Sequence, residues 1–306
     1  MVVLRYEAYE RSDLACESCA GNFSGIAGSV FSERDVGDIH ITQLNIRTEE
    51  ASHKIQKPIG TYLTLECGRF DRMNLETREM LCHILAGEIR GMALRLGAKL
   101  SPVDLNVLVA GLGNAELTAD AIGPKTVGQL TVTRHLRTYE KELFESADCA
   151  SLSAIAPGVL GQTGIETLEV LRGAVRYVHP DVVLVVDALA ARSCERLAST
   201  VQLSDVGITP GSGVGNHRAA IDKETLGVPV IAIGIPTVVH SATLVYDALQ
   251  EAGIDKIDDR LHHVLESGRS FFVSPKESDL ISAHGAGMLA KAIELSFGGA
   301  LSEYGL

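Results

Sequence analysis

The chain has 306 residues, 46% of them hydrophobic, and a formal net charge of -12. This length can build one large α/β domain or two smaller ones around a sizeable core. The excess of acidic side chains repels polyphosphate backbones, so direct nucleic-acid binding is not expected.

The cysteines and the hydropathy pattern indicate a cytosolic chain without membrane attachment. The six cysteines are few for this length and lie mostly in apolar contexts, which favours reduced thiols over a disulfide framework. Cys16 and Cys19 form a lone C-x-x-C, without the second pair that a zinc site would need. No apolar run reaches the roughly 18 residues of a membrane span. The acidic N-terminus lacks the basic and apolar blocks of a signal peptide.

The first part of the chain carries the weakest structural signals. Residues 1–55 are polar and without a sustained hydrophobic period, and three glycines interrupt any helix. We interpret them as a loosely attached leader followed by edge elements. Residues 59–66 alternate as a strand does, and residues 75–96 place apolar side chains at helical intervals.

From there the chain alternates strands and helices. Aliphatic runs predict strands at 105–110, 182–186 and 228–235, and residues 150–156 and 201–208 are further strand candidates. Helices are predicted from near Pro124, over 165–177, from Pro236 to about 253, and over 279–297 with an N-cap at Ser278 or Asp279. Residues 254–278 are more polar and are expected to form an excursion or lid. The alternation predicts an α/β fold, a three-layer sandwich with a mostly parallel central sheet flanked by helices, in a single large domain.

The stretch from Asp181 to Ser193 contains the strand most clearly predicted to be buried. Five consecutive aliphatic residues from Val182 are typical of a strand covered on both faces of a parallel sheet. Asp187 ends this run, at the edge of the sheet where ligands of α/β proteins bind. The alternative is that Asp187 only N-caps a helix beginning near Ala188.

Asp120, shortly after the strand at 105–110, is a possible partner for Asp187. If the two strands are neighbours, both carboxyl groups face one crevice and hold one proton between them. Such a pair can activate a water and protonate a leaving amine, as amide hydrolysis without a covalent intermediate requires. The alternative is that both acids are caps or turn residues.

Other constellations are less specific. Gly111-x-Gly113 is followed by Glu116 where a dinucleotide fingerprint needs its third glycine, and residues 210–216 lack the Gly-Lys-Ser/Thr of a phosphate loop. The candidate nucleophiles are Ser193, Ser212 and Cys194. Neither serine lies in G-x-S-x-G. Cys194 is expected just inside a helix N-terminus that would favour its thiolate, but no paired histidine can be named. A metal held by both aspartates and a histidine is chemically sensible, the candidates being His135, His217 and His240.

Several long motifs follow one another between about residues 104 and 240. They occupy residues 111–114, 118–124, 132–136, 153–159, 161–167, 187–193, 205–208, 210–216, 223–230 and 234–239. Together they resemble the germination protease family of spore-forming bacteria. Several motifs in the same order identify a family far more specifically than any single motif does.

The resemblance implies an endopeptidase that degrades the small acid-soluble proteins coating spore DNA, within the cytoplasm of the spore core. In that family two acids make the peptidase aspartic in type, and these fall here on Asp120 and Asp187. The resemblance also implies a zymogen that is a homotetramer and removes an N-terminal peptide by self-cleavage. Residues 11–15 look like the processing site, which places the cut between Asp13 and Leu14. Residues 1–13 would then be a propeptide and residues 14–306 the peptidase domain, with no cofactor.

A second family is similar in part. The G-x-G-N followed by an acid, and the strand ending Val-Asp-Ala, also resemble the hydrogenase maturation endopeptidases, which share the fold and can bind a metal. That alternative assigns the metal to Asp120, Asp187 and His240, where His240 stands at a position expected to be acidic in germination proteases. A third alternative is a regulatory homologue that has lost proteolysis.

The resemblance suggests roles for the site residues. Asp120 and Asp187 would share a proton and a water. The candidates for substrate binding or for stabilising the oxyanion are Gly113, Asn114, Gly158, Ser212 and Gly213. A helix beginning after Asp187 would lower its pKa, so we expect Asp187 to be the more readily ionised of the two acids.

Overall fold

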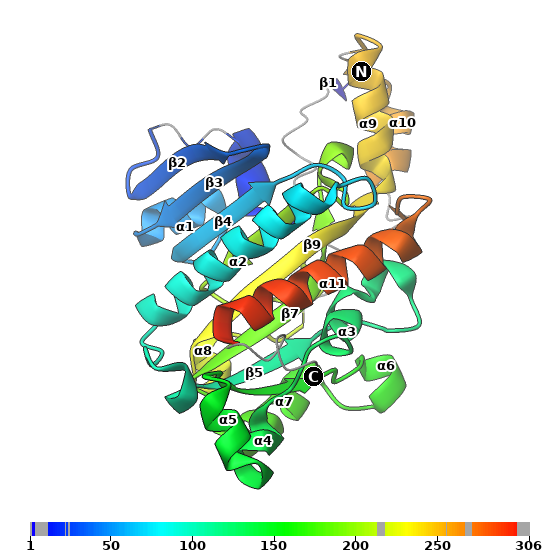
Figure 1. Cartoon of the computed structure of the whole chain (residues 1–306). Coiled ribbons are helices and arrows are strands. Elements are labelled where there is room, and N and C mark those ends of the chain that lie inside the picture. The colour runs from blue at the N-terminus through cyan, green and yellow to red at the C-terminus, as the bar shows by residue number, and fades with distance from the viewer. Residues whose placement is uncertain are drawn as a thin grey trace.

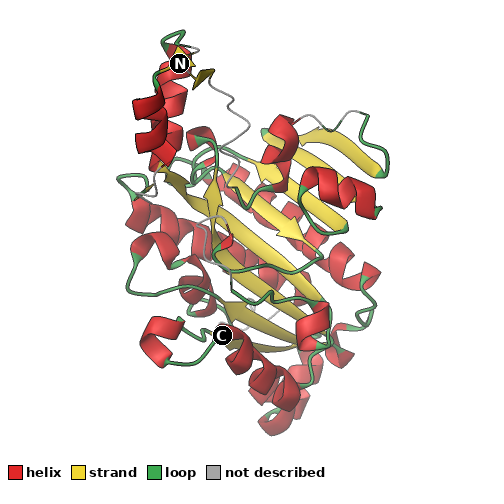
Figure 2. Ribbon diagram, turned by 180° about the vertical axis from the view of Figure 1, so that it is seen from behind, coloured by secondary structure: helices red, strands yellow, loops and turns green. Residues whose placement is uncertain are grey.

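The computed structural model describes residues 2–3, 12–21, 23, 25–212, 218–254, 256–266 and 271–298. In this part of the chain nine strands form one sheet, with helices on both sides (Figures 1 and 2). Eight of them follow the order β2, β3, β4, β8, β9, β7, β5, β6, and β11 pairs with β9. This arrangement confirms the predicted α/β sandwich.

The elements have the following bounds. The strands are β1 (Val2–Val3), β2 (Ser29–Val36), β3 (Ile39–Ile46), β4 (Gly60–Glu66), β5 (Asn106–Gly111), β6 (Ser151–Ile155), β7 (Val182–Ala191), β8 (Thr200–Ser204), β9 (Val230–His240), β10 (Lys256–Ile257) and β11 (Phe272–Val273). The α-helices are α1 (Glu49–Ile55), α2 (Leu75–Arg95), α3 (Ile122–Val127), α4 (Arg134–Tyr139), α5 (Lys141–Ser146), α6 (Leu160–Thr163), α7 (Thr167–Val178), α8 (Lys223–Leu226), α9 (Ser241–Glu251), α10 (Asp259–Glu266) and α11 (Ser278–Phe297). The 3-10 helices are η2 (Ala15–Gly21), η3 (Pro102–Asp104), η4 (Thr118–Asp120) and η5 (Cys194–Arg196).

The strands that carry the candidate acids belong to the parallel part of the sheet. Strand β5 pairs in parallel with β6 and β7, and β7 pairs in parallel with β9. Strands β2, β3, β4 and β8 extend the sheet beyond β9 with antiparallel pairings. The sheet is therefore mixed, with a parallel core.

Strand β7 is buried on both faces, as its aliphatic run predicts. Val182, Leu184 and Val186 pack into the cluster that contains α2, α11 and part of α3. Val183 and Val185 pack into the opposite cluster, with α7 and α8. Because side chains alternate along a strand, Asp187 lies on the same face as Val183 and Val185.

Two strands are longer than predicted, and the N-cap interpretation of Asp187 is wrong. Strand β7 continues through Asp187 to Ala191 because β9 runs beside it over the same length. Strand β9 likewise continues through Pro236, where a helix was expected. The pairing skips Thr237, which forms a bulge next to Pro236. Bulges are among the few places where a sheet accommodates a proline.

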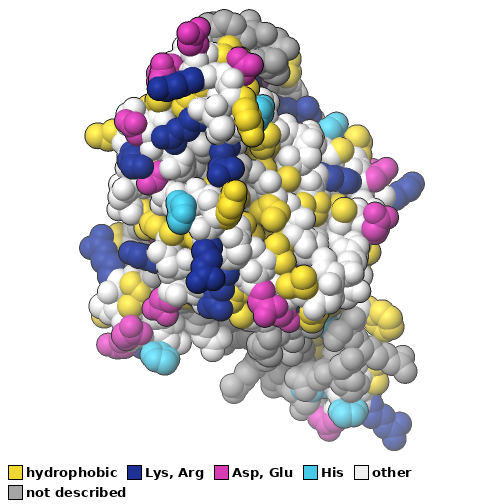
Figure 3. Space-filling model, turned by 90° about the horizontal axis from the view of Figure 1, so that it is seen from below, with side chains coloured by type: hydrophobic (Ala, Val, Ile, Leu, Met, Phe, Trp, Pro, Cys, Tyr) yellow, Lys and Arg dark blue, Asp and Glu magenta, His cyan; other side chains and the backbone are white. Residues whose placement is uncertain are grey.

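The C-terminal part differs in detail from its prediction. The N-cap residue of α11 is Glu277, without a side-chain bond, instead of Ser278 or Asp279. The polar stretch 254–278 contains β10, α10 and β11, and β11 extends the sheet by pairing Phe272 with His240. No helix in the described ranges is long and apolar enough to cross a bilayer. On the face seen from below, basic and acidic side chains are interspersed (Figure 3).

The described part of the N-terminal leader is packed against the sheet, and so is not loosely attached. Leu14 and Ala15 are 0% exposed. Leu14 lies in a hydrophobic cluster with Leu189, Ala191 and Val239 at the far ends of β7 and β9. The extension of these strands beyond β5 creates the surface on which this segment lies.

Candidate active site

Asp187 lies where the neighbouring strand β5 stops. The last residue of β5, Gly111, is opposite Val186, and the following Leu112 N–H donates to the Val186 carbonyl at 2.8 Å. Asp187 is therefore the first residue of β7 without β5 beside it. On its other side it pairs with Gly234 of β9. The side chain is only 6% exposed.

Asp120 reaches the same place from the loop after β5. It ends η4, and its Oδ2 accepts from the Asn114 N–H at 2.8 Å. Gly113 allows the loop after β5 to adopt this conformation. Its φ is +107°, and a Cβ there would lie 2.0 Å from the Asp120 carbonyl oxygen.

A second glycine brings helix α3 onto the sheet. A Cβ on Gly123 would lie 2.2 Å from the Leu112 carbonyl oxygen and 2.5 Å from that of Val186. Only a residue without a side chain permits this backbone contact. Because η4 leads directly into α3, the contact at Gly123 sets the position of Asp120 relative to β7.

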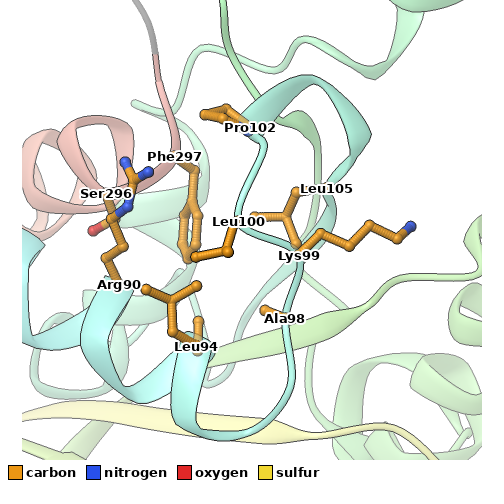
Figure 4. A pocket seen from close by; sticks show the side chains of 10 residues that line it. Arg90, Leu94, Ala98, Lys99, Leu100, Pro102, Leu105, Ser296 and Phe297 are labelled. Carbon is orange, nitrogen blue, oxygen red and sulfur yellow. The ribbon is translucent and has the colours of Figure 1, made fainter.

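Both acids line one cavity of about 740 Å³. Asp13 and Arg218 line it as well, together with apolar side chains that include Leu117 and Phe272. By contrast, the small hollow between α2 and the end of α11 (Figure 4) has a volume of about 10 Å³, room for one water at most. The cavity at the aspartates is large enough to admit a segment of polypeptide.

The two carboxyl groups differ in their readiness to ionise. Burial raises the pKa of Asp187 well above its usual value, and the charges of Asp120 and Asp13 raise it further. Burial also raises the pKa of Asp120, opposed by the Asn114 N–H and by the charge of Arg218. The expectation that Asp187 is the more readily ionised acid is wrong, because no helix begins after it to hold its charge.

The raised pKa of Asp187 predicts a pH-dependent gain in stability for Asp187→Asn. Below about pH 4, the usual pKa of an aspartate, Asp187 is neutral in both the folded and the unfolded chain. At higher pH the unfolded chain releases this proton while the folded chain keeps it, so the free energy of unfolding falls until the folded pKa is reached. Asparagine does not ionise and avoids this loss.

Thermal melts at pH 4 and pH 7 check this expectation. The gain in melting temperature should be small at pH 4 and larger at pH 7, by about 2–4 °C for each kcal/mol regained. The matched control is Asp181→Asn, a half-buried carboxylate that pairs with Lys99 and accepts from the Asn106 N–H. It should show no such gain at pH 7. Equal shifts for Asp187→Asn at both pH values would contradict the assignment.

The other candidates for substrate binding are spread over the site. Gly113 lines the cavity, and Asn114 donates to Asp120. Gly158 does not line the cavity, although its neighbour Val159 does. Ser212 Oγ donates to Asp13 Oδ1 at 2.6 Å. Gly213 lies outside the described residues, as does His217.

The structure does not bring the alternative metal ligands together. His240, at the end of β9, packs edge-on against Phe272 with ring centroids 5.5 Å apart, and its Nδ1 accepts from the Ala242 N–H. It does not line the cavity of Asp120 and Asp187. Among the described residues no group of three or more His, Cys, Asp or Glu side chains could hold a metal ion. The donor set therefore does not fit the metal alternative.

The cysteines near the site are poor nucleophiles. Cys194 begins only the three-residue helix η5, and burial raises the pKa of its thiol, so the expected stabilisation of a thiolate is wrong. Burial also raises the pKa of Cys16 to about 11. Thiols with raised pKa values are largely unreactive near neutral pH.

No pattern in the sequence predicts that Asp13 lies in the cavity with Asp120 and Asp187. Its N–H donates to the Ala190 carbonyl, and its Oδ2 accepts from the Ala190 N–H, both at 2.9 Å. Lys57, Gln202 and Arg218 were also missed. They come from three distant parts of the chain, and no local pattern marks them.

Comparisons with known proteins show what this chain is similar to. A family model described as germination protease matches residues 8–257. Germination protease of Clostridium perfringens strain 13 is 42% identical over 248 residues, covering 81% of this chain and 73% of that protein. Germination protease of Caldanaerobacter subterraneus subsp. tengcongensis is 38% identical over 301 residues, covering 91% and 90%. Among solved structures, a hydrogenase maturation protease from Thermococcus kodakarensis KOD1 is 17% identical with a TM-score of 0.33, covering 62% of this chain and 93% of that one.

Proposed function

The chain belongs to the germination protease family, and from this premise we propose that it cleaves small acid-soluble spore proteins in the spore core during germination. Membership of the family makes the chain a protease. The proposal adds the substrate, synthesis as a zymogen that removes residues 1–13 itself, and assembly as a homotetramer. The observation that carries it is the meeting of Asp120, Asp187 and Asp13 in one cavity.

The proposed mechanism uses the difference between the two acids. Asp120 is the less buried and accepts a hydrogen bond from the Asn114 N–H, which favours its ionised form. It takes a proton from water as the water oxygen bonds to the peptide carbonyl carbon. Asp187 is protonated and gives its proton to the peptide nitrogen as the C–N bond breaks. The charge of Arg218 stabilises the ionised acid.

The proposal is tested with purified full-length protein and a small acid-soluble spore protein. After mild acidification and partial dehydration, mass spectrometry should find a new N-terminus at Leu14. The shortened chain should then cut the spore protein into discrete fragments, in the presence or absence of a chelator. Loss of cleavage with the chelator would favour the metal alternative. Full activity of a chain that still begins at residue 1 would contradict the zymogen, and no cleavage by either form would favour the regulatory homologue.

A further inference from the structure

The peptide bond between Asp13 and Leu14 is held by side chains on both sides. The Asp13 carbonyl oxygen accepts from Lys57 Nζ at 3.1 Å and from Gln202 Nε2 at 3.1 Å. Gln202 Oε1 accepts from the Ala15 N–H at 2.6 Å, so one amide group binds the backbone on both sides of Leu14. The Leu14 N–H donates to Ser12 Oγ at 3.0 Å, and this hydroxyl donates to Glu17. The carbonyl and the amide of this bond are both fixed in orientation.

The positions of the strands place Gln202 and Asp187 across from each other. Gln202 of β8 and Asp187 of β7 both pair with Gly234 of β9. Paired residues on neighbouring strands point to the same face, and strands are about 4.8 Å apart, so the two side chains stand about 10 Å apart. Gly234 between them has no side chain. Asp13 borders the cavity of the acids on one side and, on the other, a cavity of about 490 Å³ lined by Lys57 and Gln202.

We propose that Lys57 and Gln202 form the oxyanion hole for self-cleavage of the Asp13–Leu14 bond. This inference rests on the proposed function, which places the cut there. When water adds to the Asp13 carbonyl carbon, it gives one proton to Asp120, and the electron pair of the C=O bond moves to the oxygen that both side chains already contact. When the C–N bond breaks, the pair re-forms the carbonyl, and the Leu14 nitrogen takes its proton from Asp187.

The surroundings of Lys57 suit this role. Burial lowers the pKa of its ammonium group, while the charges of Asp13 and Glu17 oppose that shift. A cation withdrawn from water interacts more strongly with a charge that develops beside it. From the sequence, the oxyanion donors are expected in the glycine loops. The donors proposed here come instead from the loop before β4 and from β8.

The test compares the rates at which full-length variants release residues 1–13. Lys57→Met removes the ammonium group, and Gln202→Glu removes the donor but keeps the acceptor for Ala15. Each should slow processing by about 10²–10³-fold, as loss of one oxyanion donor does. Lys57→Arg keeps a cationic donor and should restore most of the rate. Lys54→Met, on the exposed side of α1, is the matched control and should process at the wild-type rate.

Two readouts separate the possible failures. If the wild-type chain is not cut between Asp13 and Leu14, the zymogen part of the proposed function fails, and the oxyanion hole fails with it. If it is cut there and Lys57→Met is cut equally fast, only the oxyanion hole is refuted. Hydrogen exchange at residues 12–17 distinguishes catalysis from simple docking of the segment. Slow processing with these amides still protected supports the proposal, whereas slow processing with the amides deprotected overturns it.

Discussion

Asp187→Asn is expected to abolish self-processing and to reduce cleavage of a spore protein by about 10⁴-fold, the upper range for a single proton-transferring side chain. Asparagine keeps the size of the side chain and its contact with the Ala188 N–H but has no acidic proton to transfer to the leaving amine. Asp120→Asn should cause a loss of similar size, because its amide takes no proton from water. Fragment assays and N-terminal mass spectrometry measure both activities.

The melting temperature distinguishes this loss of activity from misfolding. Asp187→Asn should be inactive while melting at a higher temperature than the wild type at pH 7. The double variant should be little worse than either single one, since residues that act as a unit are not additive. Glu116→Gln, an exposed carboxylate in the same loop as Asp120, should keep full activity. Self-processing by Asp187→Asn at the wild-type rate would refute the shared-pair mechanism.

Gly123→Ala is expected to destabilise the protein by about 3 kcal/mol, near the upper end for overpacking a core. The added methyl group meets backbone oxygens of Leu112 and Val186, which do not move aside as a flexible side chain would. To relieve this clash, α3 has to move away from the sheet, and it carries η4 and Asp120 with it. Activity should therefore fall even under conditions in which the variant remains folded.

The same substitution elsewhere provides the control. A Cβ on Gly173 in helix α7 would meet no atom within 4 Å. Gly173→Ala should raise the free energy of unfolding by about 0.5–1 kcal/mol, because alanine favours a helix over glycine. Urea unfolding of the two variants should give shifts of opposite sign. A Gly123→Ala protein as stable as the wild type would show that the contact between α3 and the sheet is not tight.

Much of the fold was predictable because its signals are local. The aliphatic runs that became β5 and β7 are long enough to identify strands buried on both faces. The placement of Asp120 and Asp187 followed from their order relative to those strands, once β5 and β7 are neighbours. The family followed from motifs spread over half the chain. These features depend on residue type and spacing, which the sequence contains in full.

What only the tertiary structure decided depends on pairing between distant segments. Strand β7 continues past Asp187 because β9 runs beside it as far as Ala191. Asp187 has no β5 residue beside it because β5 stops at Gly111. Which of Asp120 and Asp187 has the higher pKa depends on how deeply each carboxyl group is buried. The contacts of Lys57 and Gln202 with Asp13 join residues 44 and 189 positions apart in the chain. Residue type and local spacing determine which elements form, but strand length, burial and long-range hydrogen bonds arise only when those elements pack together.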